Sequence, residues 1–192
     1  FTFASQQIRN VATIGGNVAH CSPCGDTVPP LIIHEAKVVL RSARGERTIP
    51  IEALPTGPYV GSILPDEMIT HFLLKPKEGV FADFQKIGRR QKLAIARISL
   101  AVMAEKDTSG KIAFARLALG SSTPTPRRMD EVEAFLSGKK PSEAVFWEAG
   151  RLLAWKMIEI SGRRPSTVYK ESAVQGLLVR ALYPMVENGK TV

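Results

Sequence analysis

Two kinds of hydrophobic pattern divide the chain, and their order limits the folds that it can adopt. Short apolar stretches that alternate with polar residues indicate β-strands; they are Lys37–Ser42, Glu46–Ile51, Glu67–Leu74, Phe81–Ile87, Ile98–Lys106 and Ile112–Gly120. Helical periodicity follows in three segments, Met129–Leu136, Ser142–Glu159 and Ser166–Met185. Strands that precede a run of helices predict an α+β fold.

Turn residues predict how these segments are connected. Ala43-Arg44-Gly45 and the segment from Asp107 to Gly110 each separate two strand patterns, so antiparallel hairpins are expected at both places. Lys75-Pro76-Lys77-Glu78-Gly79 interrupts the alternation and predicts a boundary between two units, residues 1–77 and 78–192. The second unit should then contain a three-stranded antiparallel sheet followed by helices. Upstream, Asp26 to Glu35 predicts a helix with an acidic first turn.

Length and charge exclude several classes of protein. The chain has 192 residues, of which 44% are hydrophobic, enough for a packed core. It contains no run of about eighteen apolar residues, so we expect no membrane-spanning helix. Its net charge of +8 favours anionic partners or an acidic protein surface. The densest basic run, between Phe84 and Ile98, is not interleaved with aromatic residues. We therefore interpret it as a solvated or subunit-facing surface rather than a nucleic-acid site.

The N-terminal residues and the two cysteines indicate the cellular setting. Phe1 to Ser5 show neither the basic region nor the cleavage site of a secretory signal, and the chain begins without methionine, as if cut from a longer one. Two cysteines are too few for a disulfide framework, which favours the reducing cytoplasm. Cys21 and Cys24 leave three interpretations open: ordinary small residues, a redox dithiol, or half of a metal site.

Motifs for several common chemistries are missing from the sequence. His20, His34 and His71 lie in different segments without a Gly-x-Ser-x-Gly elbow, so a hydrolytic triad has no support. There is no Walker-type Gly-Lys-Ser/Thr motif, and Gly15-Gly16 lacks the spacing of a dinucleotide-binding fingerprint. We therefore predict no catalytic side chain and no bound metal, and a cofactor that supplies the reactivity.

A glycine pair near the N-terminus is the best candidate for a binding site. In Thr13-Ile14-Gly15-Gly16-Asn17, the two glycines allow positive φ angles and close approach of a ligand to the backbone. Exposed amides of such a turn can hold phosphate oxygens, and Asn17 adds a side-chain amide. Downstream, Ser22 and Asp26 offer a hydroxyl and a carboxylate to a ribose or to neighbouring amides. Taken alone, the pair also fits a simple turn.

Several motifs in a fixed order resemble one protein family. Gln7 to Val18, followed by Ser22-Pro23-x-x-Asp26, is similar to the second flavin-binding segment of the medium, FAD-carrying subunits of molybdenum hydroxylases, which include xanthine dehydrogenase and aerobic carbon monoxide dehydrogenase. The resemblance continues over nearly the whole chain, through Val39–Pro50, Leu64–Thr70, Phe84–Arg90 and Ala118–Arg127.

The resemblance implies a fold and a set of cofactor contacts. FAD would lie between two subdomains of a vanillyl-alcohol-oxidase-like fold, of which this chain carries the second, followed by a C-terminal lobe with a three-stranded sheet and helices. Thr13, Gly15, Gly16 and Asn17 would approach the pyrophosphate and ribose, with Ser22 and Asp26 nearby. Ile69 would lie against the isoalloxazine ring, and Lys86 would place a positive charge near it.

The resemblance also implies an electron route and partners. Electrons would pass from a molybdenum-pterin catalytic subunit, through a 2Fe-2S subunit, to FAD and then to NAD or another acceptor. The sequence departs from the family by His20, Cys21 and Cys24, and by the absence of the first glycine-rich subdomain. For that reason we expect the isolated chain to bind FAD poorly and to be inactive alone. The alternative is a non-catalytic interaction lobe that has lost FAD.

Overall fold

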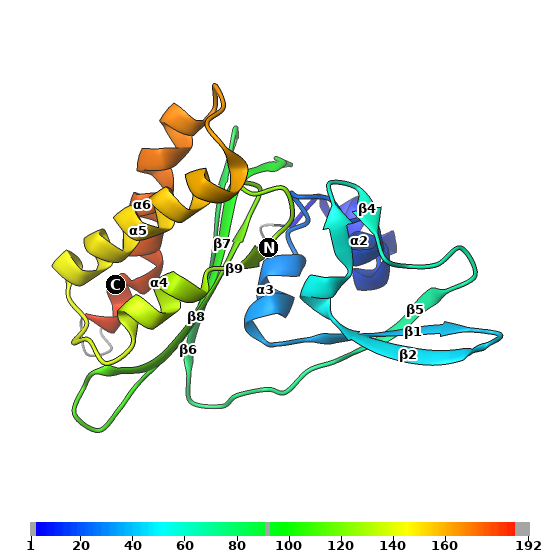
Figure 1. Ribbon diagram of the computed structural model, residues 1–192, viewed down its shortest axis with the longest axis horizontal. Helices are drawn as coiled ribbons and strands as arrows, with labels where there is room; N and C mark the ends of the chain where they lie inside the picture. The colour runs from blue at the N-terminus through cyan, green and yellow to red at the C-terminus, as the bar shows by residue number, and fades with distance from the viewer. Residues whose placement is uncertain (1–2, 91–92, 187–192) are drawn as a thin grey trace.

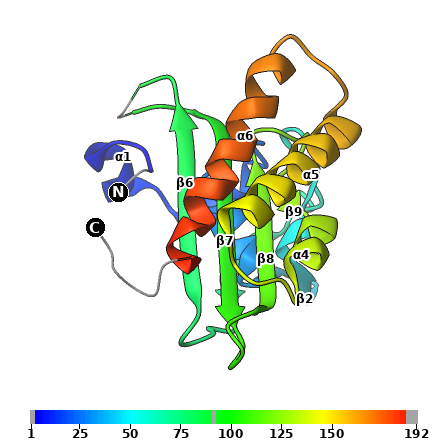
Figure 2. The same cartoon turned by 90° about the vertical axis from the view of Figure 1, so that its left-hand side faces the viewer.

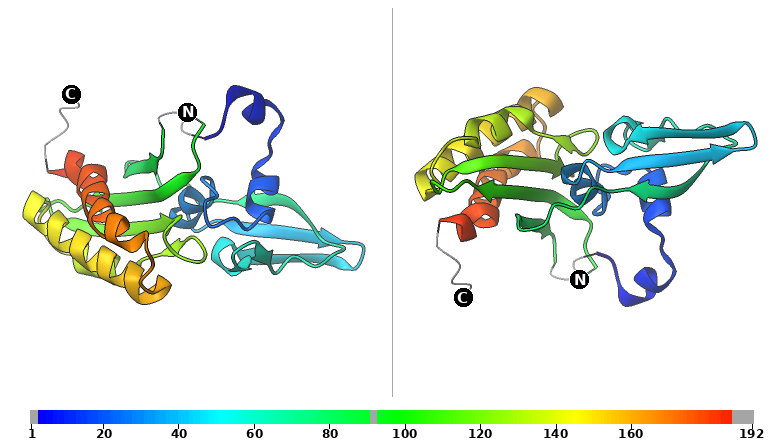
Figure 3. Two further views of the ribbon diagram at one scale, coloured as in Figure 1. Left: turned by 90° about the horizontal axis from the view of Figure 1, so that it is seen from above. Right: turned by 90° about the horizontal axis from the view of Figure 1, so that it is seen from below.

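An N-terminal lobe is built on a small antiparallel sheet. The computed structural model describes residues 3–90 and 93–186. The three-stranded sheet has the order β2-β1-β5, with its strands at Lys37–Ser42 (β1), Gly45–Pro50 (β2) and Met68–Leu73 (β5). The remaining elements of this lobe are α1 (Gln6–Val11), α2 (Ile14–Ala19), α3 (Val28–Ile33), the 3-10 turn Ile51–Ala53, β3 (Pro55–Gly57) and β4 (Val60–Gly61). Helix α1 stands away from the main body (Figure 3) and has no buried residue.

A second sheet and three helices form the C-terminal lobe. Its four antiparallel strands have the order β6-β7-β8-β9 and extend over Phe81–Gly88, Ala96–Lys106, Ile112–Gly120 and Arg127–Arg128. The helices α4 (Asp130–Leu136), α5 (Glu143–Ser161) and α6 (Thr167–Leu182) cover one face of this sheet, as Figure 2 shows. A 3-10 turn, Tyr183–Met185, follows α6. Helix α3 lies against the opposite face (Figure 1), so the second sheet is the middle layer of the molecule.

Strand β7 supplies side chains to both hydrophobic cores. Ile98, Leu100 and Val102 belong to the core beneath α4, α5 and α6. Ala101 and Met103 belong to the core that contains α3 and β1. Because successive side chains of a strand point to opposite faces, a strand buried on both faces reads as a nearly continuous apolar run.

Charged side chains connect the N-terminal lobe to the far edge of the second sheet. The carboxylate of Glu35, just after α3, lies 2.8 Å from Arg116 of β8 and 3.4 Å from Arg128 of β9. Arg116 also donates to the carbonyl of Ile33 at 3.1 Å. Arg128 in turn pairs with the buried carboxylate of Glu133 on α4. These contacts fix the two lobes relative to each other through one arginine on each strand.

The sequence predicts most of these elements, with errors at particular places. The strands Lys37–Ser42 and Ile112–Gly120 have the predicted bounds. The helix predicted from Asp26 begins only at Val28, with Thr27 as its N-cap, so the expected acidic first turn is wrong. Proline is well tolerated in the first turn of a helix, and Pro29 and Pro30 occupy the first turn of α3. The prediction of three strands in the second sheet omits the two-residue strand β9. Met68, the first residue of β5, is 66% exposed.

Among the described residues, no helix combines the length and apolar character that crossing a membrane requires.

Candidate functional site

Helix α2 carries the glycine pair, and its geometry corrects the sequence interpretation. Thr13 is the N-cap of α2, and its Oγ1 accepts a hydrogen bond of 2.9 Å from the amide of Gly16. Gly15 and Gly16 therefore have helical backbone angles, and neither has the positive φ expected for a turn. A threonine N-cap starts a helix strongly enough to include two glycines. Within the described chain, the amides of Ile14 and Gly15 have no hydrogen-bond partner.

Thr27, in the segment that follows α2, is hydrogen-bonded to the predicted site residue Asn17, and the predicted Ser22 closes a turn within that segment. Thr27 donates from its hydroxyl to Oδ1 of Asn17 at 2.5 Å. Ser22 accepts from the amide of Cys24 at 3.2 Å through Oγ and from the amide of Gly25 at 3.0 Å through its carbonyl, which closes a tight turn. Asn17 is thus held by its carbonyl oxygen, and its amide nitrogen is left to donate to another group.

A buried ion pair joins this segment to the second sheet. Lys86 on β6 donates from Nζ to Oδ2 of Asp26, and the two side chains are only 8% and 9% exposed. Burial raises the pKa of the Asp26 carboxyl, although the hydrogen bond and charge of Lys86 oppose that shift. The other carboxylate oxygen, Oδ1, is buried without a hydrogen-bond partner among the described residues. This oxygen can accept a hydrogen bond from a ligand hydroxyl.

A row of small residues beside Lys86 lets the N-terminal segment approach the sheet closely. Ser99 of β7 is paired with Lys86 on one side and with Gly120 of β8 on the other. A Cβ atom at Gly120 would lie 2.4 Å from Oγ of Ser99 and 3.0 Å from Cγ of Pro29. Only glycine fits between them, so Gly120 allows the segment that carries Asp26 to reach Lys86.

Ile69 completes the group of predicted contacts. It lies on β5, half-buried against the N-terminal core. A Cβ atom at Gly15 would be 3.8 Å from Cγ2 of Ile69, so this side chain borders the start of α2. The structure thus brings residues from α2, the segment 22–27, β5 and β6 into one region, although these segments are far apart in the sequence.

An apolar pocket of about 290 Å³ opens beside Asp26. Besides Asp26 and Thr27, its lining consists of the side chains of Phe3, Ile14, Pro30, Leu31 and Phe84. A mostly apolar wall with a carboxylate at its edge is the usual composition of a site for an organic cofactor.

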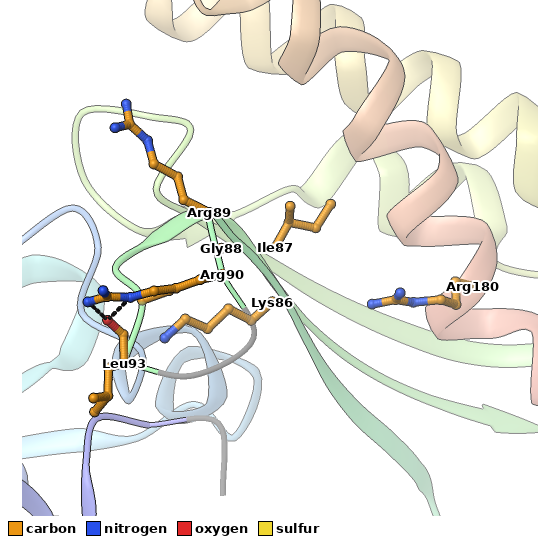
Figure 4. Close-up of a pocket in the computed structure, with 8 residues that line it drawn as sticks. Lys86, Ile87, Gly88, Arg89, Arg90, Leu93 and Arg180 are labelled. Carbon is orange, nitrogen blue, oxygen red and sulfur yellow. Dashed lines mark hydrogen bonds between the residues drawn. The ribbon is translucent and has the colours of Figure 1, made fainter.

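A second pocket, of about 450 Å³, lies on the other side of Lys86 and is strongly basic. Arg89 and Arg90 follow β6, and Arg180 reaches it from α6 (Figure 4). Arg90 is held by two hydrogen bonds to the carbonyl of Leu93, at 3.0 and 2.7 Å, and Arg180 donates to Gln85. Arginine side chains fixed in this way favour phosphate and carboxylate ligands.

Comparison with known proteins assigns both lobes. Residues 1–74 match the family model described as the FAD binding domain in molybdopterin dehydrogenase. Residues 83–185 match the model of the CO dehydrogenase flavoprotein C-terminal domain. The chain belongs to the FAD-binding subunits of the molybdenum hydroxylases. The cofactor of this family is FAD.

Individual flavin subunits of this family show the extent of the match. The chain is 37% identical to the xanthine dehydrogenase FAD-binding subunit of Escherichia coli O157:H7 over 134 residues, which is 69% of this chain and 46% of that subunit. It is 27% identical to the nicotinate dehydrogenase FAD-subunit of Eubacterium barkeri, over 96% of this chain and 64% of that one. The chain therefore spans about half to two thirds of the length of these curated relatives.

Solved structures of the family share the fold. The carbon monoxide dehydrogenase of Hydrogenophaga pseudoflava, in a form that lacks the Mo-pyranopterin moiety, superposes with a TM-score of 0.84 at 25% identity. That match covers 96% of this chain and 65% of the other. The expected α+β architecture, with antiparallel sheets and a helical C-terminal lobe, is confirmed.

The two cysteines, Cys21 and Cys24, differ in environment. Cys21 is buried, with its Sγ only 2.7 Å from the position of a Cβ at Gly61, and burial raises the pKa of its thiol. A raised pKa disfavours the thiolate that redox chemistry needs. Cys24 is half-buried and also free. Among the described residues, no three potential metal ligands lie together. Cys21 therefore acts as a packing residue.

Several residues of this flavin-family site were not predicted from the sequence. Phe84 lines the apolar pocket, and Arg180 lines the basic one. The alternation of β6 contains part of this information, since Phe84 and Lys86 share a face whereas Gln85 and Ile87 share the other. The contribution of Arg180 comes from α6, about a hundred residues later, and no local pattern indicates it.

Proposed function

We propose that this chain forms one wall of an FAD site in a molybdenum hydroxylase and passes electrons toward an acceptor. The observation that carries the proposal is the buried pair between Asp26 and Lys86, which joins the segment after α2 to the second sheet. It lies between an apolar pocket and a basic pocket. FAD, when bound, accepts electrons and releases them to the acceptor.

Within this proposal, the residues of the chain bind and orient the cofactor. Thr13, Gly15, Gly16 and Asn17 face the pyrophosphate and ribose with backbone and side-chain amides. Ser22 and Asp26 add a hydroxyl and a carboxylate, and the unpaired Oδ1 of Asp26 accepts a hydrogen bond from a hydroxyl of the cofactor. Ile69 provides an apolar contact to the isoalloxazine, and Lys86 provides a positive charge near it.

The proposed domain organisation and partners follow from the same reasoning. Residues 1–77 would form the second FAD-binding subdomain, and residues 78–192 would form the C-terminal domain. Electrons would reach FAD from a molybdenum-pterin subunit through a 2Fe-2S subunit, in the cytoplasm. Arg89, Arg90 and Arg180 line the basic pocket. Their positive charges support an anionic acceptor such as NAD.

Flavin content of the assembled complex tests the proposal. The chain would be produced together with the proposed 2Fe-2S and molybdenum-pterin subunits and with any segment that precedes it. We expect flavin absorbance close to one FAD per chain and reduction of that flavin by the substrate of the complex. A folded, flavin-free complex would reject the proposal and support a non-catalytic interaction lobe.

In the Lys86→Met variant flavin content should fall, whereas the Lys140→Met variant should retain it, because Lys140 is exposed on the connection before α5.

A further inference from the structure

A third pocket lies at the corner where α5 meets α6. Its volume is about 210 Å³, and it shares no lining residue with the apolar pocket beside Asp26 or the basic pocket beside Lys86. Its walls are the turn after β8, the loop between α5 and α6, and two prolines of the N-terminal lobe. Six hydroxyl side chains line it: Ser121, Ser122, Thr123, Ser161, Ser166 and Thr167. The hydroxyls of Thr123, Ser161 and Thr167 already make hydrogen bonds within the chain, which leaves those of Ser121, Ser122 and Ser166 for a polar ligand.

Two cations are fixed at the wall of this pocket. Lys170 donates to the carbonyl of Ser121 at 2.6 Å, and Arg164 donates from Nε to the carbonyl of Ser161 at 3.2 Å. Each keeps further N–H groups for a ligand, because a lysine has three donors and an arginine has five. Among the described residues that line the pocket, none is acidic. Burial lowers the pKa of Lys170, and the charges of Arg164 and Arg97 add to that effect against an opposing contribution from Cys24.

Two buried serines in this pocket lack hydrogen-bond partners. Ser121 and Ser122 are 8% and 7% exposed, and neither Oγ is hydrogen-bonded within the described chain. Buried hydroxyl groups normally have a partner, since an unsatisfied one destabilises the fold. Ser121 also has a φ of +62°, a left-handed conformation that is uncommon for residues other than glycine. Such strained conformations are concentrated at binding sites.

The N-terminus of α6 adds the positive end of a helix dipole to the pocket. This helix of 16 residues begins at Thr167, and its N-cap Ser166 makes no capping hydrogen bond from its side chain. Its first turn contains no acidic residue, so no side-chain charge neutralises the positive end of the helix dipole. The amide of Thr167 already donates to the carbonyl of Arg164 at 2.8 Å, so an anion bound at this end would be stabilised mainly by the dipole.

We infer that this pocket binds a phosphate group. A tetrahedral oxyanion can accept hydrogen bonds on several sides at once, which suits hydroxyl groups from two loops and cations from a third side. At about 210 Å³, this pocket is smaller than the apolar pocket of about 290 Å³ and the basic pocket of about 450 Å³. One phosphate group with a few waters fits this space better than a dinucleotide does. This inference does not depend on the flavin proposal.

The test is a titration of the 192-residue chain with inorganic phosphate, followed by the ³¹P NMR line width at constant ionic strength. We expect saturable broadening with the parent chain and with the control Lys140→Met. In the Lys170→Met and Ser122→Ala variants, phosphate affinity should fall, by about tenfold or more for the lysine. Arg164→Met repeats the test at an exposed position if Lys170→Met fails to fold. Equal broadening in all variants, or none with the parent chain, would overturn the inference.

A second arm of the experiment identifies the source of the phosphate. FAD would be added to the phosphate-saturated complex that contains the whole flavin subunit. Release of phosphate would assign the pocket to the pyrophosphate of the flavin and overturn its proposed position at Thr13 to Asn17, and retention would assign the pocket to a separate phosphate-bearing ligand. Either outcome requires that Lys170→Met lower the phosphate affinity by about tenfold or more, so the pocket itself is tested in both cases. A failure of FAD binding with intact phosphate binding would reject the proposed function alone.

Discussion

Lys86 places its ammonium group on the carboxylate of Asp26, which lies sixty positions earlier in the chain. The two residues belong to different lobes, and both side chains are almost completely buried. The free energy of removing two charges from water is offset only while both charges are present. This pair therefore ties the folding of the first lobe to that of the second at the point where we propose that FAD binds.

The Asp26 and Lys86 pair should behave as one unit in a double-mutant cycle. Asp26→Asn or Lys86→Met alone leaves a buried charge without its partner, which should lower the free energy of unfolding by about 3 kcal/mol. The double variant should lose less than the sum, with a coupling energy of about 2 kcal/mol. Urea denaturation measures these values. The exposed pair Arg44 and Asp66 is the control, with an expected coupling of less than about 1 kcal/mol; similar coupling in both pairs would contradict the prediction.

Gly15→Ala should raise the stability of the chain while lowering its affinity for FAD. Because Gly15 lies in α2 and a Cβ there would make only ordinary contacts with Ile69, alanine should stabilise the chain by about 0.5 to 1 kcal/mol. The same methyl group should lower FAD affinity if the cofactor approaches the backbone at this position. Gly176→Ala on α6 is the control, since a Cβ there meets nothing within 4 Å. Unchanged FAD affinity in Gly15→Ala would remove Gly15 from the proposed site.

Glu67 should give the first sheet an acid-sensitive contribution to stability. Its side chain is only 5% exposed and pairs with Arg47 at 2.7 Å. Hydrogen bonds from Arg47 and from the amide of Leu64 lower the pKa of Glu67 from 4.5 to about 2. A depressed pKa stabilises the folded state above pH 4.5, and this contribution is lost as the pH falls toward 2. The stability difference between the parent chain and Glu67→Gln should therefore shrink in this window, and a difference that stays constant from pH 7 to pH 2 would refute the assignment.

Ala101→Leu should destabilise the contact between the two lobes. Ala101 is fully buried on the face of β7 that meets α3. Overpacking there should lower the free energy of unfolding by about 1 to 3 kcal/mol. Ala82→Leu on the neighbouring strand is the control, because Ala82 is exposed. Equal stability of the two variants in thermal denaturation would show that α3 is not tightly packed on the sheet.

The sequence predicts local structure better than it predicts the site. Strands β1 and β8 are predicted with correct ends because each is an apolar stretch next to a turn signal, Ala43-Arg44-Gly45 after β1 and Asp107 to Gly110 before β8. The glycine pair is assigned to a turn rather than to α2, since its φ angles depend on the Thr13 cap and on packing that short-range patterns do not contain. The contact between Lys86 and Asp26 depends on Gly120, a residue whose role becomes visible only when Pro29 is placed against the sheet.

Strand β7 has a consequence for how insertions and deletions are tolerated. Both faces of β7 are apolar and buried, so the usual difference between a solvent-exposed face and a buried face cannot determine which way its side chains point. The shapes of the two cores do so instead: Ile98, Leu100 and Val102 pack beneath the helices, whereas Ala101 and Met103 pack against the N-terminal lobe. Losing one residue from β7 would move every side chain beyond that point to the opposite face. Such a change would mispack both cores at the same time, so β7 should accept length changes less readily than any neighbouring loop.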